Sequence, residues 1–200
     1  IPLIRKVAST GKPIIISTGM ASISEIDEMV STIRSSGCEK IILLKCTSTY
    51  PANSGNSNVL TVPHMRDLFS CEVGLSDHTL GIGASVAAVS LGATVIEKHF
   101  TMRRKDGGVD SQFSLEPKEF KMLVDETKAA WKALGKIHYG PTEDEKKSIK
   151  FRRSIYISEN INVGDKLTSK NIRIVRPGFG LAPKYYDLLL GKKINRELKK

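Results

Sequence analysis

The sequence predicts an α/β protein built around a parallel sheet, and two observations support that prediction. Between residues 12 and 134 a pattern repeats: a short β-branched apolar run, a polar or Gly-containing turn, and a segment with the apolar spacing of a helix. The apolar runs are nearly continuous, as in parallel strands that are buried on both faces. Strands and helices that alternate along a chain join by right-handed crossovers into a parallel sheet.

Four such βα units are visible. Their apolar runs are residues 13–16, 41–44, 73–75 and 94–96. The first helix should begin after Ser22, because Ser22 and Glu25 have the spacing of a capping box. The last should begin near Pro117 and end at Gly135, with Trp131 in the core. Four units make half of an eight-stranded barrel or a small open sheet, since a complete barrel needs about 250 residues.

Composition excludes several classes of protein. The 200 residues carry 31 Lys plus Arg against 21 Asp plus Glu, and 40% are hydrophobic, which excludes collagen, a disordered tail and a disulfide-stapled mini-protein. Three cysteines without C-x-x-C spacing indicate reduced structural thiols. Residues 79–96 approach the length of a membrane span, but Gly92 interrupts them, so we expect a buried helix and strand. The N-terminus has no signal-peptide pattern, so we expect a cytoplasmic protein with no membrane partner.

A change in charge marks a second module. Residues 1–140 hold 16 basic and 14 acidic side chains, whereas residues 141–200 hold 15 and 7. We therefore expect a domain over 1–139, a polar linker over 140–150, and a small module of short strands over 151–200. About 50 residues bury only a small hydrophobic core, so we expect this module to pack against another protein surface. The basic residues could attract an anionic partner, but no nucleic-acid-binding motif appears, so no nucleic acid is predicted.

Polar residues follow each apolar run, where parallel α/β folds bind ligands. Strand alternation puts Ser76 and His78 on one face, and Glu97 and His99 on one face of the next strand. If these strands are neighbours, the two imidazoles lie at one level on strands about 4.8 Å apart. That arrangement predicts an open site for Mn²⁺, Mg²⁺ or Zn²⁺. The alternative is that each histidine only forms a hydrogen bond at a strand end.

Two further features lie at the same edge of the predicted sheet. Ser17, Ser48 and Ser76 offer hydroxyls of the kind that a phosphate or carboxylate site needs, although such residues also cap helices. Residues 103–111 are too long and too charged for a minimal turn, which indicates either a functional loop or a solvated one.

Taken together, these motifs resemble the sialic acid synthase family over nearly the whole chain. The matching segments are Gly11-Lys12-Pro13, Ser17 to Met20, Cys46-Thr47-Ser48 with Tyr50-Pro51, Gly74 to Thr79, Glu97 to Phe100, Ser114 to Pro117, and Arg176-Pro177-Gly178. The resemblance implies the C-terminal half of a (β/α)8 TIM barrel, followed by a small β-rich antifreeze-like (SAF, β-clip) domain over 151–200. It also implies that four βα units and a few C-terminal residues are missing, so we expect an inactive fragment of a longer enzyme.

The resemblance implies a transferase that condenses phosphoenolpyruvate with the open-chain aldehyde of an N-acetylated amino sugar. The products are a nine-carbon nonulosonic acid and phosphate. His78 and His99 match the metal ligands, normally for Mn²⁺ or a similar divalent ion such as Mg²⁺, which makes both catalytic. Glu97 matches an acidic residue that is a candidate for proton transfer.

The remaining matches are substrate-binding positions. Ser17, Ser48 and Ser76 match positions that hold phosphoenolpyruvate, and Asp110 would face the sugar. In the domain-swapped homodimer of the family the SAF module covers the partner's barrel mouth, and Arg176 matches the arginine that reaches the sugar's acyl group.

Within the family, Cys46-Thr47-Ser48 and residues 107–111 look like the pseudaminic acid synthases. N-acetylneuraminate synthases typically have Asn in place of Ser48 and Gly-Pro-Asp-His in place of residues 108–111. The first alternative is an N-acetylneuraminate or legionaminate synthase with the same chemistry. Two others are a non-catalytic assembly or polyanion-binding module, and an unrelated open-sheet phosphosugar enzyme.

Overall fold

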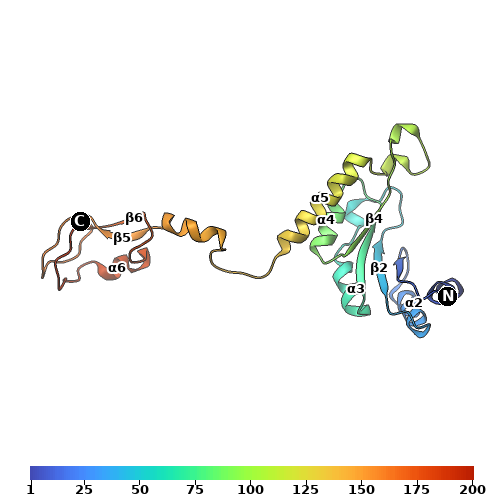
Figure 1. The fold of residues 1–200 in the computed structure, drawn as a ribbon, viewed down its shortest axis with the longest axis horizontal. Coiled ribbons are helices and arrows are strands. Elements are labelled where there is room, and N and C mark those ends of the chain that lie inside the picture. Colours follow the sequence, from blue (N-terminus) through green and yellow to red (C-terminus); the bar gives the residue numbers. More distant parts are fainter. The chain divides into compact units, whose positions relative to one another are not determined.

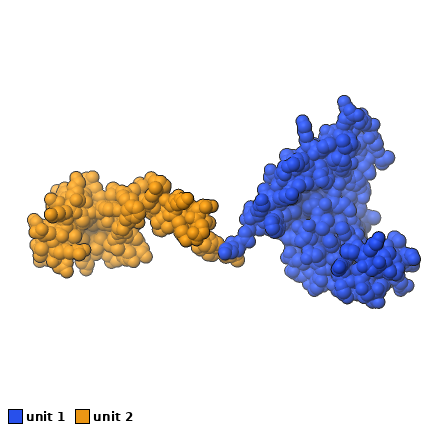
Figure 2. Space-filling model, viewed as in Figure 1, with its two compact units in different colours: residues 1–136 blue, residues 137–200 orange.

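The computed structural model describes residues 1–200 and divides them into two compact units, residues 1–136 and 137–200 (Figure 2). The first unit alternates helices with strands (Figure 1). Its elements are α1 (Pro2–Ala8), β1 (Ile14–Ser17), α2 (Ile23–Ser35), β2 (Ile41–Cys46), α3 (Thr61–Phe69), β3 (Glu72–Asp77), α4 (Gly83–Ser90), β4 (Val95–Lys98) and α5 (Pro117–Leu134), with short 3-10 helices η1 (Ser54–Asn56), η2 (Arg104–Asp106) and η3 (Ser111–Phe113).

The four strands form one parallel sheet in the order β1-β2-β3-β4. The prediction of four βα units and a parallel half-barrel is therefore confirmed, as are a helix and a strand within 79–96. Strand β4 is half-buried and not buried as expected, because it is an edge strand of the sheet. The strands extend beyond the apolar runs at their carboxyl ends, because the polar residues Cys46, Asp77 and Lys98 remain in the ladder. This extension brings polar side chains into the regular alternation of the sheet.

Helices α1 to α4 cover one face of this sheet. Their buried side chains, such as Ile33 and Val62, pack against strand residues of the same face, such as Leu43 and Val73. Helix α2 begins as predicted, because the Ser22 N–H donates to Glu25 Oε2 at 2.7 Å and the Glu25 N–H donates back to the serine hydroxyl. The helices thus leave the opposite, inner face of the sheet free for the site.

Gly74 allows β3 and β4 to approach closely on that inner face. A Cβ at this position would overlap the carbonyl oxygen of Val95, its partner in the register of the two strands. Glycine is therefore required here by space and not by backbone conformation.

Helix α5 has the predicted bounds, but the expectation that Trp131 lies in the core is wrong. Trp131 is 66% exposed, and Leu123 is the buried residue of the helix. Helix α5 packs against α4, and β4 is an edge strand of the sheet, so no further βα unit follows to cover the last turns of α5. Trp131 instead lines an open groove together with Val89, Ala93 and Ile96.

The second unit contains a small antiparallel sheet, β5 (Ser154–Ile157) with β6 (Ile172–Val175). Two short helices follow, the 3-10 helix η5 (Pro183–Tyr185) and α6 (Tyr186–Leu189). Ile161, Leu167 and Ile172 form its small buried core. No helix of the chain is both long enough and apolar enough to cross a membrane.

The segment expected to be a linker is partly helical. Residues Asp144–Phe151 form the 3-10 helix η4, which belongs to the second unit and whose Lys150 carbonyl accepts a hydrogen bond from the Gly178 N–H. The helix forms because Thr142 and Glu145 exchange capping hydrogen bonds, with the Thr142 N–H donating to Glu145 Oε2 at 2.8 Å. Sequence analysis interpreted the charged composition of residues 140–150 as a linker and overlooked the capping pattern of Thr142 and Glu145.

Candidate active site

Three side chains that predicted a ligand site meet on the inner face of the sheet. The Ser76 hydroxyl at the end of β3 donates to Glu97 Oε1 on β4 at 2.7 Å. The Ser17 hydroxyl at the end of β1 donates to the same oxygen at 3.4 Å. Because β1 and β4 are the two edges of the sheet, these contacts require the sheet to curve around its inner face.

His78 and His99 lie one step beyond this cluster, directly after β3 and β4. Their ring centroids are 5.2 Å apart, with the planes at 71°. The register pairs Ser76 with Glu97 and Asp77 with Lys98, so the two histidines follow at the same level. His78 is buried, whereas His99 is about a third exposed toward the open side.

Each histidine ring has an oxygen beside its Nδ1 atom. His78 Nδ1 lies 3.0 Å from the carbonyl oxygen of Thr47, and His99 Nδ1 lies 3.6 Å from Asp110 Oδ2. A carbonyl oxygen only accepts, so a hydrogen bond here needs the proton on His78 Nδ1, and the neutral ring with that tautomer has its lone pair on Nε2. Metal-binding histidines are held in this way by outer oxygens.

This donor set fits an open cation site. No group of three or more His, Cys, Asp or Glu side chains in the chain could hold a metal ion. The two histidines would therefore leave several coordination positions to water or substrate oxygens, as catalytic sites do. A closed structural metal site does not fit these residues.

Aromatic rings surround the two histidines. The ring of Tyr50 lies 4.3 Å from that of His78, and the ring of Phe113 lies 5.0 Å from that of His99. Tyr50 and Phe113 are themselves 5.9 Å apart. Sequence reasoning quoted Tyr50 only within a motif and missed Phe113, which gives no signal because it lies in the irregular segment before α5.

Ser48 lies close by but outside the Ser17, Ser76 and Glu97 cluster. Its hydroxyl is 3.6 Å from Cys46 Sγ, and a Cβ on Gly19 would lie 3.1 Å from it. The half-buried hydroxyl thus lies over the turn that follows β1.

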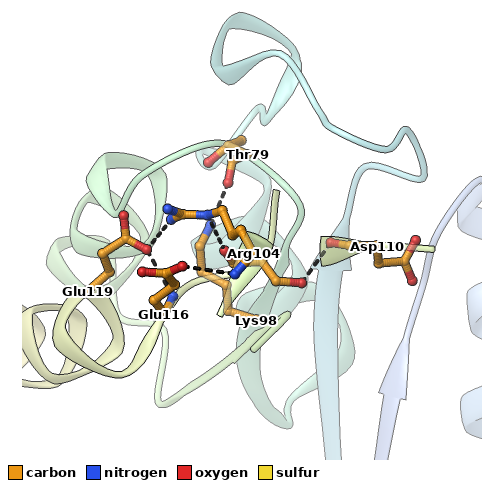
Figure 3. A network of polar contacts seen from close by, with 7 residues as sticks. Thr79, Lys98, Arg104, Asp110, Glu116 and Glu119 are labelled. Carbon is orange, nitrogen blue, oxygen red and sulfur yellow. Dashed lines mark hydrogen bonds and ion pairs between the residues drawn. The ribbon is translucent and has the colours of Figure 1, made fainter. Parts of the chain in front are cut away.

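The loop that leads to Asp110 is mostly exposed, but hydrogen bonds fix its course. The guanidinium of Arg104 pairs with Glu119 and donates to the carbonyl oxygen of Ser114 at 3.0 Å, and the Ser114 hydroxyl donates to the Asp110 carbonyl at 2.7 Å. The hydrogen bond from Arg104 lowers the pKa of Glu119. In Figure 3 the carboxylate of Asp110 points away from this network. Its partner is His99.

A buried ion pair lies on the reverse face of the same strands. Lys98 Nζ is 2.9 Å from Asp77 Oδ2, and both side chains are 1% exposed. Burial by itself raises the pKa of Asp77, but hydrogen bonds from Ser85, Lys98 and the Thr79 N–H outweigh it and leave the pKa below its ordinary value. Sequence reasoning missed this pair, although two charges inside otherwise buried strands were a usable signal.

Arg176 belongs to the second unit, directly after β6, and is therefore not among the residues that meet in the first unit. The other predicted site residues, Ser17, Ser48, Ser76, Glu97, His78, His99 and Asp110, all lie at or beyond the carboxyl ends of the strands in the first unit.

A curved parallel sheet of four strands with its polar strand ends on the inner face is half of an enzyme-type α/β barrel. Comparison with known proteins identifies which one: the chain belongs to the NeuB family, whose model matches residues 1–139, and a SAF domain model matches residues 152–200.

Similar proteins include a pseudaminic acid synthase and an N,N'-diacetyllegionaminic acid synthase, both of Campylobacter jejuni. The first is 41% identical over 98% of this chain and 57% of its own length, and the second 39% identical over 96% and 58%. The crystal structure of an N-acetylneuraminic acid synthetase from Leptospira borgpetersenii is similar with a TM-score of 0.68, at 37% identity over 76% of this chain and 53% of that one. The chain thus spans little more than half the length of these relatives.

Proposed function

We propose that this chain is part of a pseudaminic acid synthase that condenses phosphoenolpyruvate with the open-chain aldehyde of an N-acetylated amino sugar. The observation that supports this most directly is the position of Glu97, hydrogen-bonded by Ser76 and Ser17 below the pair of histidines. In the reaction, carbon 3 of phosphoenolpyruvate bonds to the aldehyde carbon. Water adds at carbon 2, and the bond from carbon 2 to the phosphate oxygen breaks. A nine-carbon 2-keto acid and inorganic phosphate result.

The chain's hydroxyls suit the anionic substrate. Ser17 is exposed and Ser48 is half-buried, so both can turn toward a carboxylate or phosphate at the mouth of the sheet. Both serine contacts of Glu97 go to Oε1, which leaves Oε2 without a protein hydrogen bond. We assign Glu97 the acceptance of a proton from the attacking water or its delivery to the aldehyde oxygen. Asp110 would contact the sugar.

His78 and His99 would hold a divalent cation, Mn²⁺ in the first instance and Mg²⁺ or another divalent ion otherwise. When bound, the cation supplies polarisation of the aldehyde oxygen. The Thr47 carbonyl and Asp110 keep the two rings oriented. Tyr50 and Phe113 pack against the sides of the rings.

The same geometry serves a synthase for N-acetylneuraminic or legionaminic acid, and the identities of 41% and 39% to the two Campylobacter enzymes lie too close to separate the sugars. We propose the pseudaminic precursor because Ser48 and residues 107–111 match that subfamily. We also propose that the full-length protein is a soluble homodimer in which the SAF unit covers the partner's site and Arg176 reaches the sugar's acyl group.

The test is phosphate release from phosphoenolpyruvate by the full-length protein with Mn²⁺, with and without a chelator. Three sugars are compared: the pseudaminate precursor, N-acetylmannosamine and the legionaminate precursor. Metal-dependent release with the first alone supports the proposal. Release with another sugar assigns the alternative, and no release with any of them rejects the condensation.

A further inference from the structure

The Asp77–Lys98 pair occupies the two positions that lie between the residues of the candidate site. In β3, Asp77 separates Ser76 from His78, and in β4, Lys98 separates Glu97 from His99. Side chains alternate along a strand, so the pair points to the helix-covered face while its neighbours point inward. Asp77 and Lys98 are partners in the register of the two strands.

The pair also holds the backbone directly after His78. Asp77 Oδ1 accepts the Thr79 N–H at 2.8 Å, and Lys98 Nζ donates to the Thr79 carbonyl at 2.7 Å, a contact drawn in Figure 3. Asp77 Oδ2 accepts the Ser85 hydroxyl of α4 at 2.6 Å. The ends of β3 and β4 and helix α4 are thereby joined at a single point.

Stability alone is a weak reason for such a pair. Removing two charges from water is costly, and apolar or neutral replacements of similar volume are often as stable or more stable. A better-supported role of buried polar groups is to fix the register in which neighbouring elements pair. Here a one-residue slip of β4 would move Glu97 and His99 to the wrong face, and a slip of β3 would do the same to Ser76 and His78.

We propose that Asp77 and Lys98 are positioning residues that hold His78 and His99 within reach of one cation, through the register of β3 and β4. The expected change in Mn²⁺ affinity rests on the proposed function. The expected change in the distance between the two histidine rings does not, because that distance is measured without metal.

The test compares the full-length protein with its Asp77→Asn/Lys98→Met variant, which removes both charges and keeps side-chain volume. Mn²⁺ affinity is measured by calorimetry, and ring-to-ring nuclear Overhauser effects between His78 and His99 are measured without metal. We expect the variant to unfold at an unchanged or higher urea concentration, to lose the ring contacts, and to bind Mn²⁺ about 10- to 100-fold more weakly, as changes in outer-shell residues do. A folded variant with unchanged ring contacts and affinity overturns the inference.

Leu75→Ala is the matched control, because Leu75 faces the same core two residues earlier in β3 and its side chain makes no polar contact with the pair. It should lower stability and leave Mn²⁺ affinity unchanged; an equal loss of affinity would overturn the inference. If the double variant fails to fold, Ser85→Ala removes one hydrogen bond from the pair and decides by the same two readouts. If the unaltered protein binds no Mn²⁺, the metal part of the proposed function fails, and the ring contacts alone decide the positioning role.

Discussion

Ser17 and Glu97 lie on the two outer strands of the sheet, yet the Ser17 hydroxyl donates to Glu97 Oε1 at 3.4 Å. A flat four-stranded sheet would separate its edge strands by about 14 Å, three times the spacing of neighbouring strands. The contact therefore shows how strongly the sheet curves. That curvature gathers the candidate residues of β1, β3 and β4 in one place.

Glu97→Gln should lower kcat by about 100-fold or more, because glutamine still accepts the serine hydrogen bonds but cannot take up a proton. KM for phosphoenolpyruvate should change little. Steady-state phosphate release measures both constants. Glu72→Gln, at the exposed start of β3, should retain full activity, and an equal loss in the two variants would contradict the role of Glu97.

His78→Ala and His99→Ala should each weaken Mn²⁺ binding by at least about 100-fold, beyond the typical effect of an outer-shell change. Calorimetric titration of the full-length protein provides the measurement. His64→Ala removes an exposed imidazole of α3 and should bind Mn²⁺ like the unaltered protein. Tight binding that survives in both single variants would place the cation elsewhere.

Arg104→Met should raise KM for the sugar several-fold while leaving KM for phosphoenolpyruvate unchanged, because Arg104 anchors the loop that carries Asp110. Stability should fall only slightly, since the ion pair with Glu119 is partly exposed and solvent screens it. Separate titrations of the two substrates distinguish the effects. Lys105→Met, in the same loop, is the control, and an equal rise in both KM values would argue against a sugar-side role.

Gly74→Ala should destabilise the protein by about 3 kcal/mol, because the added methyl group meets the Val95 backbone, which has no free space to move into. Urea unfolding measures the change. Gly83→Ala, at the first position of α4, meets no atom within 4 Å and should be neutral or stabilising. If the two variants were equally stable, β4 would not lie against Gly74.

Acid should unfold the protein partly through Asp77. Its pKa lies below the ordinary value of 3.8 in the folded state, so its stabilising contribution is complete above that value and is lost as the pH falls through the folded pKa. Asp77→Asn should therefore flatten the dependence of unfolding free energy on pH between about pH 5 and pH 3. Asp67→Asn, at a side chain that is 77% exposed, is the control and should not change how the unfolding free energy depends on pH. An equally weakened pH dependence in this variant would show that the effect is not specific to Asp77.

Much of the first unit was predictable because its signals are local. The apolar runs, the capping box at Ser22 and the alternation at residues 76–78 and 97–99 each depend on a few neighbouring residues. They placed the strands and set His78 beside His99. The capping signal at Thr142 was equally local, but it was concealed by charged neighbours.

Other features depend on contacts between distant segments. The pairing of Asp77 with Lys98, the place of Phe113 beside His99 and the exposure of Trp131 follow from how strands and helices pack. The periodicity of the sequence places Trp131 on the apolar side of its helix. It does not indicate whether another helix or strand covers that side.

Trp131 is the only tryptophan in the chain, and its indole lies in the open groove beside β4. The tryptophan fluorescence of these 200 residues therefore comes from one known place, outside the candidate site. Whatever covers this groove will shift the emission to shorter wavelength and shield the indole from dissolved quenchers. The protein thus carries a built-in optical reporter on its exposed sheet edge, and no dye has to be attached to use it.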